Sequence, residues 1–441
     1  MNRSMHSNIK GIFYALAFLV ALSSAEAQQN LLKSGPMLGP VTLRTATLWA
    51  QTSKEAKVEF RYRLKDSKDN FSTTESIMTN HSNAFIATAI ASLLTPGKRY
   101  EYQLVINEEV VKTAYPTTFT AQTLWAYRMD APDFTFATGS CLYINETEFD
   151  RPGKSYGGEY EILSNMYKSK PDFMVWLGDN TYLREGDYDS KAGIYHRYTH
   201  TRSVPELQPF LGSVAQYATW DDHDYGPNDS DWTYPLKNYT LEAFKNFWPN
   251  EAYGAGHTEA VTSSFVWNDC QFFMLDDRWY RTVETDNGTI LGEQQKYWLK
   301  EALLNSKATF KFVCVGGQFL SNAAIFENFA NFKEERQEII DYIDDKNIKG
   351  VVFLTGDRHH TEITKLVTAK GNTIYDATVS AITSTTYDHS AEKNTLRVPG
   401  SMISERNYGV FNVSGSKEKR ALNAKFFNTV GKQLYEYNFT F

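Results

Sequence analysis

The sequence has few cysteines for an exported protein, and this limits how the fold can be stabilised. Three cysteines, Cys141, Cys270 and Cys314, occur among 441 residues. Small exported domains that depend on disulfides show more cysteines, usually in even number, so that class is excluded. An odd number leaves at least one thiol unpaired. Cys270 and Cys314 lie in strand-like runs and are expected in the core, whereas Cys141 follows directly after such a run.

The chain is also short of positive charge. Its formal net charge is −7, and no basic cluster of useful length is present. A nucleic-acid-binding surface is therefore not expected. An anionic small-molecule substrate would need a local positive charge, for which a bound metal is one source. The sequence also lacks the P-loop and HExxH motifs, so the mechanisms that those motifs serve are not expected.

No apolar run is long enough to span a membrane. The run IFYALAFLVAL, residues 12–22, follows Arg3 and Lys10 and precedes the small-residue site Ala25-Glu26-Ala27. That order is typical of a secretory signal peptide. We therefore expect residues 1–27 to be removed and the mature protein, without a transmembrane segment, to be periplasmic or secreted. Since the leader has no twin-Arg pair and no Cys follows the apolar run, the Sec route is expected.

Residues 28–128 show an all-β pattern. Short β-branched and aromatic runs such as AKVEFRYRLK and KRYEYQLVIN are bounded by turn residues at spacings typical of a sandwich. The turn at 94–97, followed by Tyr100 and Tyr102, resembles the turn into a late strand of fibronectin-type domains. We predict a small fibronectin- or immunoglobulin-like β-sandwich domain. It carries no cluster of reactive residues, so a structural or docking role is expected.

Residues 129–441 show a different pattern, in which short apolar runs alternate with helical stretches. The helical stretches are EYEILSNMYKS, TLEAFKNFW, GEQQKYWLKEALL and KEERQEIIDYIDD. Strands that alternate with helices predict an α/β domain. The fold class expected for the whole chain is therefore an α/β catalytic domain that follows a small all-β domain.

Polar clusters follow six of the apolar runs in this second domain. The runs are DFTFAT, DFMVWL, VAQYATW, CQFFML, FKFVCV and GVVFLT, and the clusters begin at residues 139, 178, 221, 276, 316 and 356. In open α/β sheets, ligand sites form outside the carboxyl ends of the strands. We therefore expect these clusters to face one cleft.

The chemistry of these clusters indicates a metal site. Thiolate, carboxylate, phenolate and imidazole are the side-chain groups that bind metals, and all four are present at the strand ends. The carboxylates of WDDHD, residues 220–224, would repel one another without a cation among them. Two or more cations would hold Asp179, Asp222 and Asp357 together. Metals about 3.5–4 Å apart are suited to phosphoester hydrolysis, with a metal-activated hydroxide as the nucleophile.

In these strand-end motifs the chain resembles the alkaline phosphatase D (PhoD-like) family, which is related in core fold to purple acid phosphatases and other metallophosphoesterases. The resemblance extends over nearly the whole mature chain and implies a metallophosphoesterase-type α/β sandwich. The motifs that carry it are GSC at 139–141, GDNTY at 178–182, WDDHD at 220–224, LDDRWYR at 275–281 and GDRHH at 356–360.

The resemblance also implies roles for individual residues. Asp179 would bridge two metals, Tyr182 would bind iron, and His223 would stabilise the phosphate or protonate the leaving group. The metal ligands implied are Cys141, Asp179, Tyr182, Asp222, Asp357 and His359, and the metals are ferric iron and calcium. His360 is expected to lie outside the set of metal ligands. Asp221 and Asp229 are expected either to support the ligands without binding metal or to lie in loops.

Five further residues are candidates for contact with substrate or metal. Arg278, Arg281 and Arg358 could grip substrate oxygens, because the guanidinium fork matches phosphate. For each of them, an ion pair is an equally good interpretation. Asn180 and Gln318 could bind or orient a ligand, and for Gln318 a turn is an equally good interpretation. Together with His223, Asn180 and Arg278 complete the predicted catalytic set.

The leading hypothesis is an exported metal-dependent phosphomonoesterase or phosphodiesterase acting on a small-molecule phosphate ester. A non-catalytic, calcium-dependent surface or adhesion protein is the alternative from another class. It fits the acidic WDDHD region but leaves Cys141 and His359 unexplained, since calcium has little use for thiolate or imidazole. A glycosidase with paired carboxylates is a third possibility, and it explains the aspartates but not the Cys, Tyr and His residues.

Overall fold

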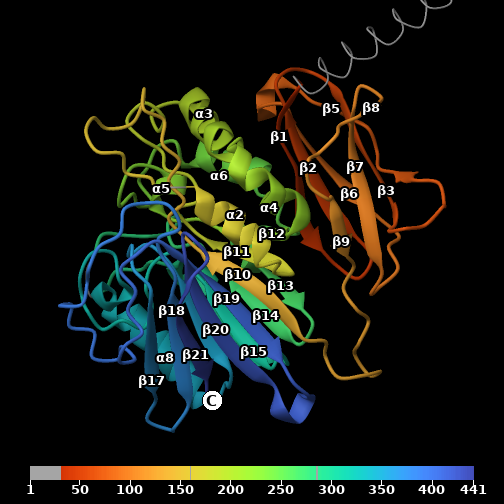
Figure 1. Cartoon of the computed structure of the whole chain (residues 1–441). Helices are drawn as coiled ribbons and strands as arrows, with labels where there is room; N and C mark the ends of the chain where they lie inside the picture. Colours follow the sequence, from red (N-terminus) through yellow and green to blue (C-terminus); the bar gives the residue numbers. More distant parts are fainter. Residues whose placement is uncertain (1–30, 159, 285–286) are drawn as a thin grey trace, which may run out of the picture.

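The computed structural model describes residues 31–158, 160–284 and 287–441 (Figure 1). The predicted leader, residues 1–27, lies outside the described residues. Within the described ranges, no helix has the length and apolar character needed to cross a membrane.

The N-terminal part of the described chain is all-β, as predicted. One sheet has the order β1-β2-β6 and the other β4-β3-β7-β8, with β5 paired to β3 and β9 to β7. The strands are β1 (Leu32–Val41), β2 (Ala46–Thr52), β3 (Lys57–Leu64), β4 (Ser72–Thr73), β5 (Ile77–Met78), β6 (Ile86–Ala91), β7 (Arg99–Ile106), β8 (Glu109–Val110) and β9 (Thr118–Thr120). Sequence analysis missed β1. The fibronectin- or immunoglobulin-like topology stays a prediction.

Alternation explains how these two sheets share a core. In β3, Val58, Phe60 and Tyr62 are buried while the residues between them are partly exposed. These side chains belong to one apolar cluster with Leu48 of β2 and Tyr102 of β7. A strand with one buried face and one wet face is the expected pattern for such a sheet.

The second part of the chain contains two six-stranded mixed sheets. The first has the order β12-β11-β10-β19-β20-β21 and the second β13-β14-β15-β16-β18-β17. The strands of the first sheet are β10 (Phe134–Gly139), β11 (Phe173–Leu177), β12 (Ala215–Thr219), β19 (Asn407–Ser414), β20 (Ala421–Asn428) and β21 (Gln433–Phe439). Those of the second are β13 (Ser263–Trp267), β14 (Cys270–Met274), β15 (Phe310–Cys314), β16 (Val351–Thr355), β17 (Glu362–Val367) and β18 (Thr373–Thr378).

All six apolar runs that sequence analysis singled out are parallel strands, three in each sheet. β10, β11 and β12 run parallel in the first sheet, and β14, β15 and β16 run parallel in the second. Because parallel strands end at the same edge, this arrangement gathers their polar ends.

The two sheets pack face to face through aromatic side chains. The ring of Phe136 in β10 lies 5.2 Å from that of Phe272 in β14 and 5.1 Å from that of Phe312 in β15. Cys270 and Cys314 are buried in this region, as predicted. Edge-to-face and offset aromatic pairs add to the area buried, so this interface is a major source of stability.

Helices cover the outer faces of both sheets. Side chains of α2 (Glu161–Lys168), α3 (Lys191–Arg202), α4 (Gln208–Ser213) and α6 (Lys237–Phe247) share one apolar cluster with the first sheet. Side chains of α7 (Gly292–Asn305) and α8 (Lys333–Asp345) share another with the second sheet. The four predicted helical stretches correspond to α2, α6, α7 and α8. The short helix α5 (Asp222–Tyr225) directly follows β12. Within the described ranges there are also five 3₁₀ turns: η1 (His81–Asn83), η2 (Pro205–Leu207), η3 (Ala255–His257), η4 (Phe329–Asn331) and η5 (Lys417–Lys419).

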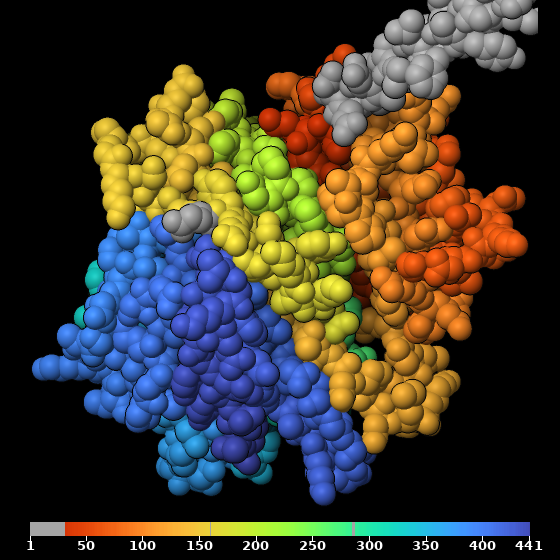
Figure 2. All heavy atoms as spheres, viewed as in Figure 1, coloured from red at the N-terminus to blue at the C-terminus, as the bar shows by residue number. Residues whose placement is uncertain are grey.

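The N-terminal region packs on the helical side of the first sheet (Figures 1 and 2). Hydrogen bonds join the two parts: Trp49 Nε1 donates to the Asn246 carbonyl at 2.8 Å, and the Tyr102 hydroxyl donates to the Gly212 carbonyl at 2.7 Å. The polar strand ends contribute to neither bond. The N-terminal region thus supports the second part of the chain without entering its polar edge.

Candidate functional site

A cavity of about 700 Å³ opens at the polar ends of the parallel strands. Seven residues named in the sequence analysis line it: Asp179, Asp222, His223, Asp229, Asp357, Arg358 and His359. Further lining residues, which sequence analysis missed, include Tyr156, Asn228, Phe326, Glu327, Tyr387 and His389. These residues come from both sheets, but only the clusters that begin at residues 178, 221 and 356 contribute to the lining, and those at 139, 276 and 316 do not, so the expected cleft is present in part.

Four different donor types converge on one point at the floor of this cavity. Asp179 Oδ2 accepts a hydrogen bond from the Tyr182 hydroxyl at 2.9 Å and lies 3.5 Å from Cys141 Sγ. The Tyr182 hydroxyl is 3.3 Å from His359 Nε2. Ligand atoms of Cys141, Asp179 and His359 all lie within 4.8 Å of one another, close enough to hold one ion. A sulfur, a nitrogen and oxygens together suit a transition metal better than calcium.

The environment of His359 fixes which of its nitrogens faces the cluster. Nδ1 is hydrogen-bonded to the Thr385 carbonyl. Because a carbonyl only accepts, Nδ1 carries the proton and Nε2, next to Tyr182, has the free lone pair. A metal-binding His is oriented in this way by a backbone carbonyl in many proteins. Ser380 completes the support, since its hydroxyl accepts from the His359 amide at 2.9 Å and donates to Cys141 Sγ at 3.1 Å.

Asp179 also belongs to a second group of donor residues. Ligand atoms of Asp179, Asp222 and His223 lie within 4.8 Å of one another, as do those of Asp179, Asp221 and Asp357. The Asp229 amide holds Asp222 Oδ2 at 2.8 Å. His223 Nδ1 is buried without a hydrogen-bond partner among the described residues, which fits a group that is completed by a ligand. Asp179 is thus the residue shared between two adjacent ligand groups.

The backbone at this edge departs from ordinary conformations. Cys141, Asp179, Asp357 and His359 have φ angles of 60°, 51°, 63° and 56°. A non-glycine residue in the left-handed region costs on the order of 1–2 kcal/mol, and such residues cluster at functional sites. Each of these residues directly follows the end of a strand or lies within four residues of it. The strand ends therefore turn sharply, and the turns aim the four side chains inward.

Glycines make the close approach of the strands possible. Gly178 has a φ of +92°, and a Cβ on it would lie 2.5 Å from the Cβ of Asp221. Any side chain at this position would therefore be strained and would push the Asp221 segment away. The glycine of GDNTY is required by packing between β11 and the WDDHD segment.

Burial and mutual repulsion act on the ionisable groups of this cluster. Burial raises the pKa of Asp179, and the neighbouring carboxylates of Asp222 and Asp224 raise it further. Burial, with Asp179 next in importance, also raises the pKa of the Cys141 thiol and of the Tyr182 phenol. A cation reverses this effect, because it favours the deprotonated form of every group that binds it.

Burial likewise shifts both histidines and Asp357. It lowers the pKa of His223 to about 4 and that of His359 to about 4, so both imidazoles are neutral and available as donors of a lone pair or an N–H. It raises the pKa of Asp357 to about 6. Burial alone would raise the pKa of Asp222, but His223, which is protonated at the low pH where this carboxyl titrates, and the Arg278 guanidinium lower it below its usual value.

The predicted arginine Arg278 lies in a buried ion-pair network. Its Nε donates to Asp221 Oδ1 at 2.7 Å and its Nη1 to Glu327 Oε1 at 2.6 Å. Arg281 also pairs with Glu327, at 3.0 Å. Ion pairing, the second interpretation offered by the sequence, therefore describes both side chains. Glu327, which sequence analysis missed, lines the cavity and connects it to this network.

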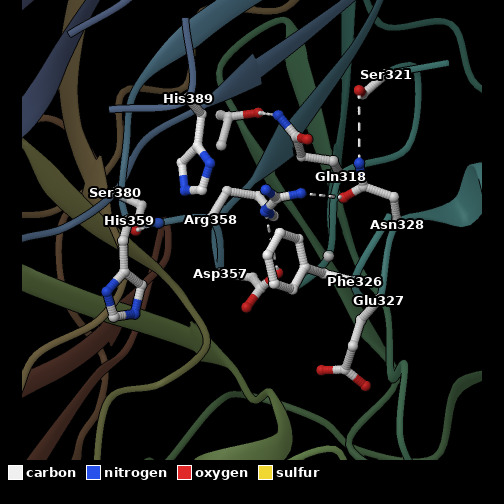
Figure 3. A network of polar contacts seen from close by, with 12 residues as sticks. Gln318, Ser321, Phe326, Glu327, Asn328, Asp357, Arg358, His359, Ser380 and His389 are labelled. Carbon is white, nitrogen blue, oxygen red and sulfur yellow. Dashed lines mark hydrogen bonds and ion pairs between the residues drawn. The ribbon is translucent and has the colours of Figure 1, made fainter. Parts of the chain in front are cut away.

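Arg358 lies closer to the open space of the cavity (Figure 3). Its guanidinium carbon is 4.6 Å from the centre of the Phe326 ring, and its Nη1 donates to Asn328 Oδ1 at 3.2 Å. Its Nη2 pairs with Glu392 Oε1. Figure 3 shows the Phe326 ring beside this guanidinium.

Three other predicted residues are held below or beside the cavity. Asn180 Nδ2 donates to the Thr219 carbonyl at 2.7 Å, while its Oδ1 is buried without a partner among the described residues. Gln318 Nε2 donates to Glu362 and to Thr378. His360 is hydrogen-bonded through Nδ1 to the Arg358 carbonyl at 3.0 Å. Gln318 and His360 are fully buried and bonded to neighbouring protein groups.

Residues Gly153-Lys154-Ser155-Tyr156-Gly157 match the G-x-S-x-G pattern of serine hydrolases. In those enzymes the serine occupies a sharp strand-to-helix turn. Here the five residues lie in the loop between β10 and α2, and Ser155 is exposed. The pattern therefore lacks the structural setting of a nucleophile. Tyr156, within it, lines the cavity.

Comparison with known proteins gives matches of fold and of sequence. A solved structure of PhoD superposes with a TM-score of 0.74 at 18% identity, covering 92% of each chain. A purple acid phosphatase, PPD1 from yellow lupin (Lupinus luteus) seeds, superposes with a TM-score of 0.67 at 12% identity, covering 91% of this chain and 73% of the other. At these identities the likeness establishes the fold, which is of the metallophosphoesterase type expected from the sequence.

The sequence matches extend to one curated protein and two family models. Alkaline phosphatase D of Bacillus subtilis (strain 168) is 25% identical over 319 residues, which are 60% of this chain; the chain spans about half, 52%, of that relative. Residues 29–124 match a domain of unknown function, DUF7800. Residues 136–416 match the model of the PhoD-like phosphatases. That match covers more than half of the chain, which thus belongs to the PhoD-like phosphatase family.

Proposed function

We propose that this protein is an exported, metal-dependent phosphoester hydrolase acting on phosphate mono- or diesters. The observation that carries the proposal is Asp179, whose carboxylate belongs to two adjacent groups of donor residues at the floor of an open cavity. A shared carboxylate of this kind is the arrangement needed to hold two ions close together. Membership of the PhoD-like phosphatase family supports the same reaction class.

The donor chemistry supports two kinds of ion. Cys141, Tyr182 and His359, with one oxygen of Asp179, form a set suited to ferric iron, because thiolate and imidazole bind transition metals rather than calcium and anionic phenolate oxygen is a strong ligand of ferric iron. Asp222 and Asp357 would supply further carboxylate oxygens beside Asp179, and these suit calcium, which takes oxygen ligands. Ions in such sites polarise phosphoryl oxygens and make water a strong nucleophile near neutral pH.

The side chains of the protein would position the substrate and stabilise the leaving group. His223 lines the cavity and is neutral above pH 4, so it retains one N–H for a phosphate oxygen or for the leaving oxygen. Asn180 presents a carbonyl oxygen without a partner among the described residues. Arg278 acts indirectly, since it holds Asp221 and Glu327 in place.

The assay of first choice is hydrolysis of 4-nitrophenyl phosphate and of its bis-ester at alkaline pH, with calcium and then with chelator. We expect turnover that chelator abolishes and calcium restores, because the substrate would be bound through the ions. Turnover that survives chelation would favour a metal-free mechanism of phosphoester hydrolysis and contradict the proposal. Metal binding without turnover of either ester would favour the calcium-dependent surface protein, for which Cys141 and His359 have no role.

Iron at the Tyr182 group has a separate optical test. Phenolate bound to ferric iron absorbs visible light, so the iron-loaded protein should be coloured. The Tyr182→Phe variant should lose the band while keeping the fold, since Phe preserves the ring contacts with Tyr143 and His223. A colourless iron-loaded protein, or a band unchanged in the variant, would contradict Tyr182 ligation.

We further propose removal of residues 1–27 on export, a supporting N-terminal domain over 28–128 and a catalytic domain over 129–441. The hydrogen bonds of Trp49 and Tyr102 to the second part of the chain support the role of the N-terminal domain. The mass of the mature protein, purified after export from a bacterial host, tests the cleavage site. A mature protein that still contains residues 1–27 would contradict it.

A further inference from the structure

A second, smaller cavity adjoins the first one. Its volume is about 210 Å³, and it shares Tyr156, His223 and Asn228 with the larger cavity. It lies on the side of the loop that contains Lys154 and includes Arg184 in its lining. The two cavities are thus neighbours, with His223 at their boundary.

Arg184 is a buried cation at this second cavity. Its side chain lies among three tyrosine rings: the guanidinium carbon is 4.8 Å from the centre of Tyr143, 5.3 Å from that of Tyr156 and 5.2 Å from that of Tyr182. Only 5% of the residue is exposed. Its Nε donates to the Tyr143 hydroxyl at 3.2 Å. Among the described residues, no carboxylate forms an ion pair with it.

The absence of an ion pair sets Arg184 apart from the other buried arginines near the site. Arg278 pairs with Asp221 and Glu327, Arg281 with Glu327, and Arg358 with Glu392. A buried charge without a partner is costly, so it is retained where a ligand supplies the opposite charge. The face of a tyrosine ring attracts a cation, and three such faces hold this guanidinium in place without neutralising it.

The rest of the small cavity is also positive. Lys154 is an exposed residue of its lining and has no ion pair among the described residues, whereas the exposed Arg151 pairs with Glu185 at 2.6 Å. The one carboxylate of the lining, Asp150, already accepts a hydrogen bond from the Tyr143 hydroxyl at 2.8 Å and pairs with Arg197 at 3.1 Å. In a chain of net charge −7, Arg184 and Lys154 lie at one small cavity without ion pairs among the described residues, and this indicates an anion site.

We propose that this cavity, with Arg184 at its floor, binds a second oxyanion of the substrate. The preferred substrates are then phosphoesters whose leaving group carries another phosphate or a carboxylate a few bonds from the scissile phosphate. A guanidinium fork accepts either group in a bidentate manner. This inference rests on the proposed function, because it places the scissile phosphate in the larger cavity. Arg184 is thereby a specificity-determining residue that binds the part of the substrate that does not react.

Three substrates with the same carbon skeleton test the inference. Glycerol 3-phosphate has a hydroxymethyl group where 3-phosphoglycerate has a carboxylate, and 2,3-bisphosphoglycerate adds a phosphate. The metal-loaded protein should show a kcat/KM about tenfold or more higher for 3-phosphoglycerate and 2,3-bisphosphoglycerate, which carry a second anionic group, than for glycerol 3-phosphate. A charge-assisted hydrogen bond has that order of effect. The Arg184→Gln variant should reduce this ratio toward one, mainly through KM, and Arg184→Lys should restore part of it.

Arg202→Gln is the matched control variant. Arg202 is also buried and stacked on an aromatic ring, with its guanidinium carbon 3.7 Å from the centre of Trp248, but it lines neither of these two cavities. Its substitution should lower the melting temperature without changing the ratio between substrates. The melting temperature of each variant separates loss of fold from loss of selectivity.

The outcomes separate failure of the anion site from failure of the proposed phosphoesterase function. Equal kcat/KM for the three substrates in the wild-type protein, or a ratio that Arg184→Gln leaves unchanged, would overturn the anion site while hydrolysis itself stands. Equal loss for all substrates in Arg184→Gln would mean that Arg184 grips the scissile phosphate, which also overturns the inference. No hydrolysis of these substrates or of 4-nitrophenyl phosphate would instead refute the proposed function.

Discussion

The interior between the two large sheets and the edge where their strands end are opposite environments within a few residues of one another. On β10, the ring of Phe136 packs against Phe272 and Phe312, with every neighbour apolar or aromatic. Five residues later, Cys141 has a left-handed backbone and a thiol beside the Asp179 carboxylate. The strand β10 thus connects the aromatic interior between the two sheets to a strand-end region with strained backbone and charged side chains.

The difference indicates a division of roles. The sheet interface gains stability from burial and aromatic packing. The strand ends lose stability through positive φ angles, close carboxylates and polar atoms without partners. Functional sites commonly combine such costs with support from a rigid scaffold. Substitutions in the two places should therefore separate stability from activity.

Asp179→Asn should have the largest effect, and it should act on activity alone. The amide has the shape of the carboxylate but cannot bridge two cations, so we expect phosphoesterase turnover to fall by more than about a hundredfold. The same change removes repulsion from Asp222 and Asp224, which raise the pKa of Asp179 in addition to burial. The metal-free variant should therefore melt at the same temperature as metal-free wild type or higher. A large fall in melting temperature would show that Asp179 has a structural role instead.

Phe136→Ala should have the converse effect. Removing a fully buried ring from the sheet interface should lower the free energy of unfolding by about 3–5 kcal/mol, measured by urea unfolding. Turnover per folded, metal-loaded molecule should change much less. If turnover per folded, metal-loaded molecule also falls steeply, the sheet interface and the strand ends are coupled and do not have separate roles.

Ser380→Ala should reduce metal affinity without removing a ligand. The Ser380 hydroxyl joins the His359 amide and Cys141 Sγ, so its loss frees two ligands to move. Loss of a supporting hydrogen bond of this kind costs about 10–100-fold in metal affinity or activity. Metal titration of the apoprotein measures it. Ser380→Thr, which keeps the hydroxyl, serves as the control, and an affinity unchanged in Ser380→Ala would contradict the supporting role.

Leu93→Ser should have the smallest effect of all. Leu93 is 87% exposed in the N-terminal region, away from both cavities. Its substitution should change the free energy of unfolding by no more than about 0.5 kcal/mol and leave turnover unchanged. A marked loss of activity would show that the N-terminal region takes part in the function, as a docking surface would.

The sequence was sufficient to predict the parts of the molecule that follow local rules. Alternating and continuous apolar runs predicted the N-terminal strands and the six parallel strands, and donor types at the strand ends predicted the residues of the cluster. Strands β19–β21 were missed, although β19 with β20 and β20 with β21 form successive hairpins. Buried and exposed side chains are mixed along β20 and β21, which is a weaker signal than the continuous apolar runs of the buried parallel strands.

Other features of the site depend on contacts that no local pattern encodes. The positive φ angles at Cys141 and Asp179 arise from the way the strand ends meet. The partners of Arg278 are 57 and 49 residues away in the sequence, so its ion pairs could not be distinguished from a free guanidinium. Arg184 lies just beyond GDNTY but outside the motif, and its three tyrosine neighbours come together only in the fold.

The measurement that tests the central claim most directly is the metal content per chain of purified wild type and of three variants, determined by elemental analysis. The account predicts at least two ions in the wild type. Cys141→Ser should lose the ion of one group and Asp222→Asn that of the other, whereas Asp179→Asn should lose both, since its carboxylate is shared. Full metal content in Asp179→Asn, in a protein that is folded, would contradict the claim that Asp179 joins two metal sites.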